Sequence, residues 1–231
     1  MKKECFIEKK VIFAFRYILC HHCILKLGAK IRLFIKNMNF LAHLLLTHEN
    51  EDWMIGNMIA DFISNKDLQS LQTGVREGVM VHRQIDTFTD SHEAVKDSIR
   101  RLHPIFHKYS PVVIDIYYDY FLARNWRRYS TIPFEDFCEK IYDAFERRMN
   151  EMPLEFQPRL KIMMDNDFLQ NYVTKSGIQF TFNKFQERVR FPVSFAQASD
   201  VMMVYEEEFN EEFNVFFPEI IGYLKEKQEI L

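Results

Sequence analysis

Residues 112–123 read VVIDIYYDYFLA, and this stretch decides the fold class. Ten of its twelve residues are apolar; the two exceptions, Asp115 and Asp119, are four positions apart and share one face of a helix. A helix that is apolar on all sides is buried. Two ionised carboxylates inside a core need a counter-charge, because an uncompensated buried charge is strongly destabilising. Either they form salt bridges, to Arg83 or Arg124 for example, or they bind or support a metal ion.

Other apolar segments of helical length follow from Asn39 onward, separated by short breaks. The breaks fall at Gly74, Ser110-Pro111, Thr131-Ile132-Pro133, Met152-Pro153, Gly177 and Pro192. Only 6 Gly and 7 Pro occur in 231 residues, too few for the turns of many short strands. The sequence therefore predicts a single all-α domain of about eight helices over residues 38–231.

Two helix starts carry local signals. Asp90 or Ser91 is a candidate N-cap for a helix that runs to about His107. Ser110 directly precedes Pro111, which is the arrangement of a capping hydroxyl followed by proline at the first helical position. We expect helices to begin at both places.

Charge divides the chain into two parts. The net charge is −3, but residues 1–37 carry nine basic and two acidic side chains, which makes them +7 and the remainder −10. An acidic body is a poor general binder of nucleic acid. No stretch reaches the eighteen or so apolar residues of a membrane span, and three of the 4 cysteines (Cys5, Cys20, Cys23) lie in the basic part. A reducing, cytoplasmic compartment is expected.

Residues 1–37 show no clean helical period and no capping signal. We interpret them as an atypical basic N-terminal extension and expect the native protein to begin at Met38. The alternative is a metal knuckle, because Cys20-His21-His22-Cys23 has C-x2-C spacing. A structural zinc site needs four ligands, and no second pair follows at suitable spacing.

Metal-type ligands recur in apolar surroundings. His82 and Asp86 are spaced i, i+4, with Asp90 one turn further along the same face, and His43 and Asp61 occur in NFLAH and GNMIADF. Imidazole and carboxylate donors together suit manganese, magnesium or iron better than a thiolate-bound structural zinc. Such a site hydrolyses phosphate esters by activating water and neutralising phosphoryl oxygens.

Four motifs together resemble the acyl carrier protein phosphodiesterase family, in order and in spacing. They are MNFLAH from Met38, GNMIADF from Gly56, GVMVHRQIDTFTD from Gly78 and DIYYDYFLARNW from Asp115, and the likeness continues to about residue 220. The resemblance implies a helical fold akin to HD-type metal phosphohydrolases and a role in fatty acid and lipid metabolism. It also implies dependence on manganese; Mg²⁺ or Fe²⁺ are the alternatives. The implied reaction releases 4′-phosphopantetheine from a serine of the carrier protein.

The resemblance also implies a set of site residues. The metal shell would contain His43, Asp61, His82 and Asp86, with Asp115 or Asp119 completing or supporting it; the catalytic residues would be Asp86, Arg83 and Asp119. Arg83 is the candidate phosphate clamp, because a guanidinium binds two phosphoryl oxygens at once. Two positions depart from the pattern, since this chain has Tyr120 and Asn125 where family members often have histidine.

An acidic carrier protein needs a basic docking surface on this acidic body. Basic residues cluster on both sides of the helix that contains Asp115 and Asp119, and electrostatic complementarity of this kind steers association. The predicted substrate-binding residues are Arg83, Arg100, Arg101 and Arg124; the alternative is an ordinary solvated basic face. Two other functions stay open, a phosphohydrolase acting on a nucleotide or another small phosphodiester, and a non-enzymatic binding module with a decayed site.

Overall fold

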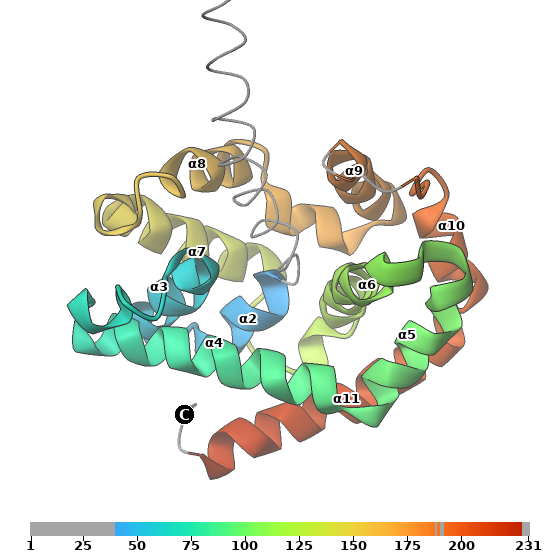
Figure 1. Ribbon diagram of the computed structural model, residues 1–231, viewed down its shortest axis with the longest axis horizontal. Helices are drawn as coiled ribbons and strands as arrows, with labels where there is room; N and C mark the ends of the chain where they lie inside the picture. The colour runs from blue at the N-terminus through green and yellow to red at the C-terminus, as the bar shows by residue number, and fades with distance from the viewer. Residues whose placement is uncertain (1–39, 188, 190–191, 228–231) are drawn as a thin grey trace, which may run out of the picture. The chain divides into compact units, whose positions relative to one another are not determined.

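The computed structural model describes residues 40–187, 189 and 192–227, and this part of the chain is helical with no strand (Figure 1). The all-α prediction is confirmed. The predicted extension and its Cys-His-His-Cys segment lie outside the described residues. No helix within the described ranges is long and apolar enough to cross a membrane.

Ten α-helices occur in the described part, somewhat more than predicted. They are α2 (Phe40–Thr47), α3 (Glu51–Ile59), α4 (Thr73–Ser91), α5 (Glu93–Phe106), α6 (Ser110–Arg124), α7 (Phe134–Arg148), α8 (Gln157–Asp165), α9 (Lys175–Gln186), α10 (Ala198–Val204) and α11 (Glu206–Glu226). Two further breaks, near Asn50 and Tyr205, account for the difference. Asn50 caps α3 by accepting hydrogen bonds from two backbone N–H groups, whereas Gly74 and Gly177 lie inside α4 and α9.

The two predicted capping side chains were assigned wrongly. Helix α4 continues through Asp90 and Ser91, and the cap of α5 is His92, whose Nδ1 accepts a hydrogen bond from the N–H of Ala94 at 3.2 Å. Ser110 is the first residue of α6 rather than its cap, and its hydroxyl donates to the carbonyl of His107 at 2.8 Å. Proline does occupy the first turn of α6, as expected.

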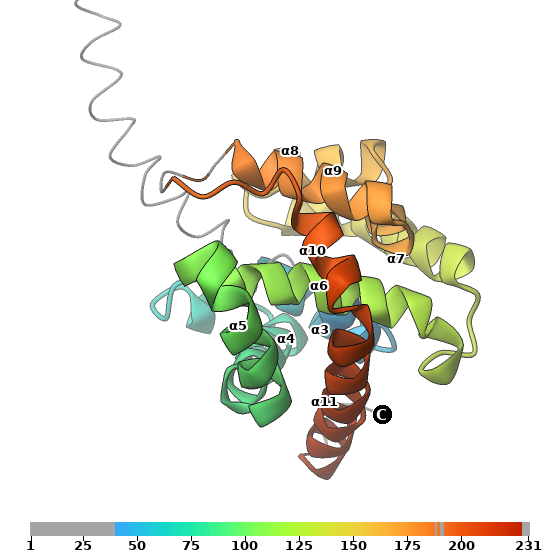
Figure 2. The same cartoon turned by 90° about the vertical axis from the view of Figure 1, so that its right-hand side faces the viewer.

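Helix α6 is the central element, as its composition predicts. Figure 2 shows it between α7, α8 and α9 on one side and α4, α5 and α11 on the other. Val113, Ile114, Ile116, Tyr117, Phe121 and Leu122 are all fully buried. Its aromatic side chains pack against α11, where the Tyr118 and Phe213 rings meet edge to face at 5.4 Å. Burial of large aromatic side chains on both helices supplies much of the hydrophobic stabilisation of the fold.

Helices α3 and α4 approach each other unusually closely, and glycine makes this possible. A Cβ atom on Gly56 would lie 2.0 Å from the carbonyl oxygen of Val75, and one on Gly78 would lie 2.3 Å from the carbonyl oxygen of Trp53. Any larger residue would push the helices apart. Asn57 follows Gly56 directly, and His82 lies one turn beyond Gly78, so this contact brings their side chains within reach of each other.

Candidate metal centre

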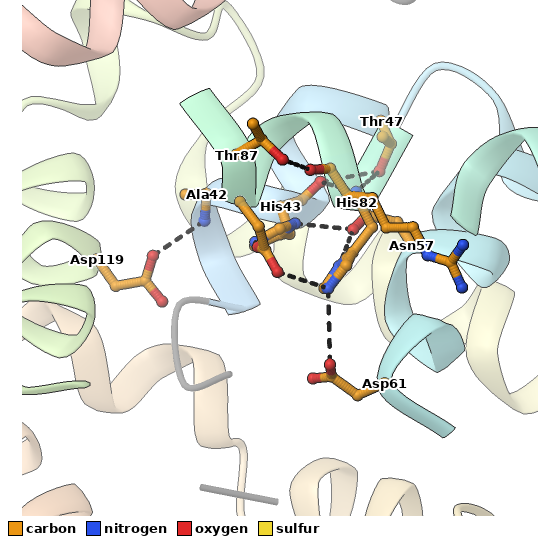
Figure 3. A network of polar contacts seen from close by, with 10 residues as sticks. Ala42, His43, Thr47, Asn57, Asp61, His82, Thr87 and Asp119 are labelled. Atoms are coloured by element: carbon orange, nitrogen blue, oxygen red, sulfur yellow. Dashed lines mark hydrogen bonds and ion pairs between the residues drawn. The ribbon is translucent and has the colours of Figure 1, made fainter. Parts of the chain in front are cut away.

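The polar cluster lies where α2, α3 and α4 meet (Figure 3). His43 comes from α2, Asn57 from α3, and His82 and Asp86 from α4. Asp61 follows α3 in a short 3-10 helix, Ala60–Phe62. His43, Asn57 and His82 are buried, and the two imidazole rings stack with their centroids 4.5 Å apart. The structure thus brings together four of the residues that the sequence predicted, and adds Asn57.

Asn57 lies behind the two imidazoles and contacts both. Its Oδ1 is 2.8 Å from Nδ1 of His43 and 2.8 Å from Nδ1 of His82. Its Nδ2 donates to the carbonyl oxygen of His43 at 3.1 Å and to Oγ1 of Thr47 at 3.3 Å. The hydroxyl of Thr47 in turn donates to the same carbonyl at 2.8 Å. All polar atoms of the Asn57 side chain are therefore engaged within this small network.

The opposite edges of the two rings face Asp86. His43 Nε2 lies 3.4 Å from Oδ1 of Asp86, and His82 Nε2 lies 3.3 Å from Oδ2. His43 Nε2 is buried and has no hydrogen-bond partner among the described residues. One ligand atom from each of His43, His82 and Asp86 lies within 4.8 Å of the other two, which is the spacing of a group that can share one cation.

Asp86 is ionised in this setting. Burial raises the pKa of its carboxyl, but the contacts with and charges of the His43 and His82 imidazoles outweigh burial and hold this pKa well below its usual range. The carboxylate therefore offers lone pairs to a cation without first losing a proton.

Asp61 lies at the edge of the cluster. One of its carboxylate oxygens is 3.9 Å from Nε2 of His82, and its side chain is 18% exposed. Figure 3 shows it on the far side of His82 from Asn57. It does not belong to the group of three close ligands, but it stands beside them as the predicted ligand set requires.

Asp115 does not join the group of close ligands. Its side chain is partly buried on α6, and burial together with the negative charges of Asp86, Asp119 and Asp90 raises its pKa well above the usual value. No salt bridge to Arg83 or Arg124 forms within the described part of the chain. The structure thus supports neither a direct ligand role for Asp115 nor the alternative of paired arginines.

Asp119, predicted as catalytic, has a different partner. Its carboxylate is fully buried and accepts hydrogen bonds from the backbone N–H groups of Leu41 and Ala42, at 3.1 and 3.0 Å. These N–H groups belong to the first turn of α2, where no intrahelical acceptor is available. Figure 3 shows Asp119 apart from the imidazoles and directed at Ala42. Asp119 therefore anchors the helix that carries His43.

The predicted basic docking surface is largely neutralised within the chain. Arg101 Nη1 contacts both carboxylate oxygens of Glu212, at 2.7 and 2.8 Å, and Arg124 pairs with Glu206. Arg100 pairs with Asp97 on its own helix. Helix α11 presents Glu206 and Glu212 to α6 and α5, so Arg124 and Arg101 have carboxylate partners within the protein, and their role in substrate binding stays a prediction. Arg83 differs: it is half-buried, and no carboxylate pairs with it within the described part.

The departures at Tyr120 and Asn125 have local structural explanations. Asn125 ends α6, where its Nδ2 donates to the carbonyl of Phe121 and to Oδ1 of Asn210, each at 2.8 Å. Tyr120 packs edge to face on Phe121 at 5.2 Å. Neither side chain contacts the close ligand group.

Comparison with known proteins identifies the family. The family model described as acyl carrier protein phosphodiesterase matches residues 38–220. This chain belongs to the acyl carrier protein phosphodiesterase family. The matched range contains His43, His82 and Asp86, the three residues that could share a cation, as well as Asn57 and Asp61.

Curated relatives carry the same family name. A protein of Enterobacter sp. (strain 638), named acyl carrier protein phosphodiesterase, is 27% identical over 192 residues, which is 83% of this chain and 100% of the relative. A protein of that name from Yersinia pestis is 25% identical over 194 residues, which is 83% of this chain and 100% of the relative. Another, from Pectobacterium atrosepticum, is 31% identical over 121 residues, which is 52% of this chain and 63% of the relative. No solved structure matches.

Proposed function

We propose that this protein hydrolyses the phosphodiester that links 4′-phosphopantetheine to a serine of acyl carrier protein, releasing apo-carrier and 4′-phosphopantetheine in the cytoplasm. Membership of the family supports the reaction. The observation that supports the chemistry is the cluster of His43, His82 and Asp86, whose ligand atoms converge within 4.8 Å. An arrangement of this kind is suited to hydrolysis assisted by a divalent cation.

The donor set fits Mn²⁺, with Mg²⁺ or Fe²⁺ as alternatives, because it combines imidazole nitrogen with carboxylate oxygen. The buried His43 Nε2, which has no hydrogen-bond partner among the described residues, supports a cation-binding role at this position. We infer that His43, His82 and Asp86 hold the ion and that Asp61, 3.9 Å from His82 Nε2, completes or supports the shell. When bound, such an ion supplies a Lewis acid that activates water and neutralises negative charge on phosphoryl oxygens.

Arg83 is the proposed phosphate-binding residue. It follows His82 on α4, is half-buried, and has no carboxylate partner within the described residues, so its charge is available to a substrate anion. A guanidinium binds two oxygens of one phosphate in a fixed geometry, which orients the ester as well as attracting it. Arg76 lies seven positions earlier on the same face of α4 and is likewise unpaired in the described part. We infer that these two arginines, rather than Arg101 and Arg124, meet an acidic carrier.

The test is direct. Holo-carrier is incubated with the protein and Mn²⁺, and mass spectrometry follows the loss of the phosphopantetheine mass from the carrier. We expect complete conversion with Mn²⁺, none with a chelator, and no comparable hydrolysis of a nucleotide panel. Preferred hydrolysis of a nucleotide, or a metal-free protein that Mn²⁺ does not stimulate, would contradict the proposal.

A pair of variants links this activity to the cluster. His82→Ala removes one imidazole and is expected to abolish Mn²⁺ binding and conversion while the helical circular dichroism is retained. Asp97→Asn is the matched control, because Asp97 is an exposed carboxylate on α5 that pairs with Arg100. If both variants convert holo-carrier equally well, the cluster is not the active site.

A further inference from the structure

The Asn57 side chain contacts both imidazoles of the metal centre, and its orientation is determined by its neighbours. If the amide were flipped, its oxygen would face the carbonyl oxygen of His43 at about the 3.1 Å now spanned by Nδ2, and two acceptors would confront each other. The observed orientation instead gives Nδ2 two acceptors, the His43 carbonyl and Thr47 Oγ1. Oδ1 is therefore the atom that faces the two rings.

A carbonyl oxygen can only accept hydrogen bonds, so both rings must donate to it. The 2.8 Å contacts from His43 Nδ1 and His82 Nδ1 to Oδ1 thus require a proton on each Nδ1. In a neutral imidazole the other nitrogen then carries a lone pair. Those lone pairs are on the Nε2 atoms, which face the two oxygens of Asp86 at 3.4 and 3.3 Å.

We propose that Asn57 is a positioning residue that fixes both imidazoles in the Nδ1–H tautomer, so that one amide oxygen aims two Nε2 lone pairs at the cation. This inference rests on the proposed function, because the orientation of the Nε2 lone pairs matters biologically when they bind a cation. Partners behind metal-bound histidines commonly fix the ring and its tautomer in this way. Here a single side chain serves two ligands from two different helices.

The close contact of α3 and α4 supports this role. Gly56, next to Asn57, would place a Cβ 2.9 Å from Cα of Gly78. Without this approach the amide of α3 could not contact a ring of α4 at 2.8 Å while also contacting His43 of α2. Asn57 itself is only 2% exposed, and its four hydrogen bonds are all made inside the protein. A buried amide with all its partners satisfied is rigid, which is what precise orientation requires.

The first measurement reads the tautomers directly and needs neither metal nor carrier. Protein labelled with ¹⁵N at histidine is freed of metal with a chelator and studied at about pH 8.5, where imidazoles are ordinarily neutral. Long-range ¹⁵N–¹H correlation spectra distinguish the two tautomers. We expect both His43 and His82 to be protonated at Nδ1. A proton on Nε2 of either ring would overturn the proposal.

The second measurement is Mn²⁺ affinity by titration calorimetry in three variants. Asn57→Leu keeps similar bulk without an acceptor, and we expect it to weaken Mn²⁺ binding about 10- to 100-fold, the usual effect of removing such a partner. Asn57→Asp keeps an acceptor for both rings but turns a second oxygen toward the His43 carbonyl, so we expect it to weaken Mn²⁺ binding clearly less than Asn57→Leu does. Thr181→Val is the control, because it removes a buried hydroxyl that, among the described residues, donates to the carbonyl of Gly177 in its own helix.

The outcomes are distinguishable. A folded Asn57→Leu protein with wild-type Mn²⁺ affinity, or equal losses in the leucine and aspartate variants, would refute the positioning role. If the leucine variant does not fold, the tautomers of the wild type and the affinity of the aspartate variant still decide the question. Failure to hydrolyse holo-carrier would count against the proposed function alone, because the tautomers and Mn²⁺ affinity are measured without that substrate.

Discussion

Two carboxylates, the partly exposed Asp86 and the fully buried Asp119, have opposite surroundings. Asp119 accepts two backbone N–H groups at 3.0 and 3.1 Å, so the protein itself provides its donors. Asp86 faces the Nε2 atoms of His43 and His82, which carry lone pairs when both rings are neutral and protonated at Nδ1. Acceptors then face acceptors, and only a cation or extra protons can relieve the repulsion. A carboxylate with its donors inside the protein is structural, whereas one surrounded by acceptors marks a site for a ligand.

The largest expected effect comes from Asp86→Asn. We predict that it lowers turnover of holo-carrier by about a thousand-fold or more, since the Lewis acid contributes several kcal/mol to such reactions. At about pH 8.5, where imidazoles are ordinarily neutral, the metal-free protein should become slightly more stable, by about 1 kcal/mol, because the new amide can donate to a histidine lone pair. Activity assays and urea denaturation of metal-free protein test the two parts. A destabilised metal-free variant would mean that Asp86 already has donors within the protein.

Gly78→Ala should have the largest effect on folding. Its Cβ would lie 2.3 Å from the backbone carbonyl oxygen of Trp53, which cannot yield as a flexible side chain could. We expect a loss of about 3 kcal/mol in the free energy of unfolding, with Mn²⁺ affinity lowered as well because α3 and α4 separate. Gly222→Ala is the control: a Cβ there meets nothing within 4 Å, and we expect a gain of about 0.5–1 kcal/mol. Equal effects at both positions would contradict the close-contact argument.

Asp119→Asn should lower the free energy of unfolding by about 1–2 kcal/mol at mildly acidic pH, because it weakens the cap of α2. Burial raises the pKa of Asp119 to about 8, even though its hydrogen bonds to Ala42, Leu41 and Tyr172 lower it. The folded protein therefore holds a proton that the unfolded chain releases near pH 4, so this contribution to stability is lost as the pH rises from about 4 through 8. Thermal unfolding of both proteins from pH 5 to 9 should show this slope in the wild type and not in the variant. Parallel curves would contradict it.

The sequence predicted the elements that depend on local pattern. The apolar run of α6 predicts a buried helix, and the i, i+4 spacing of His82 and Asp86 places two ligands on one face of α4. The apolar surroundings of His43 and Asp61 indicated these two residues, and the family motifs then supported them. None of these inferences required knowledge of which helices touch.

Features that depend on tertiary contact could not be predicted in this way. Asp119 accepts an N–H group 78 residues away, and Arg101 pairs with a carboxylate 111 residues away. Asn57 lies inside the motif GNMIADF, but its contact with both imidazoles depends on how closely α3 and α4 approach. The only local signal was a glycine on each helix, Gly56 and Gly78, in a chain poor in glycine. That signal could have suggested a close helix crossing beside the ligands.

The smallest expected effects come from a comparison of two arginines, Arg83 and Arg101. Arg83→Gln removes a guanidinium that has no carboxylate partner in the described part of the chain, and we expect KM for holo-carrier to rise about ten-fold, the loss of one charge-assisted contact of about 1.4 kcal/mol. Arg101→Gln should leave KM unchanged and lower stability by about 1 kcal/mol, because it frees Glu212. Kinetics at low salt and chemical denaturation measure both. If KM rises more for Arg101→Gln than for Arg83→Gln, the carrier docks on α5 even though Arg101 pairs with Glu212 of α11.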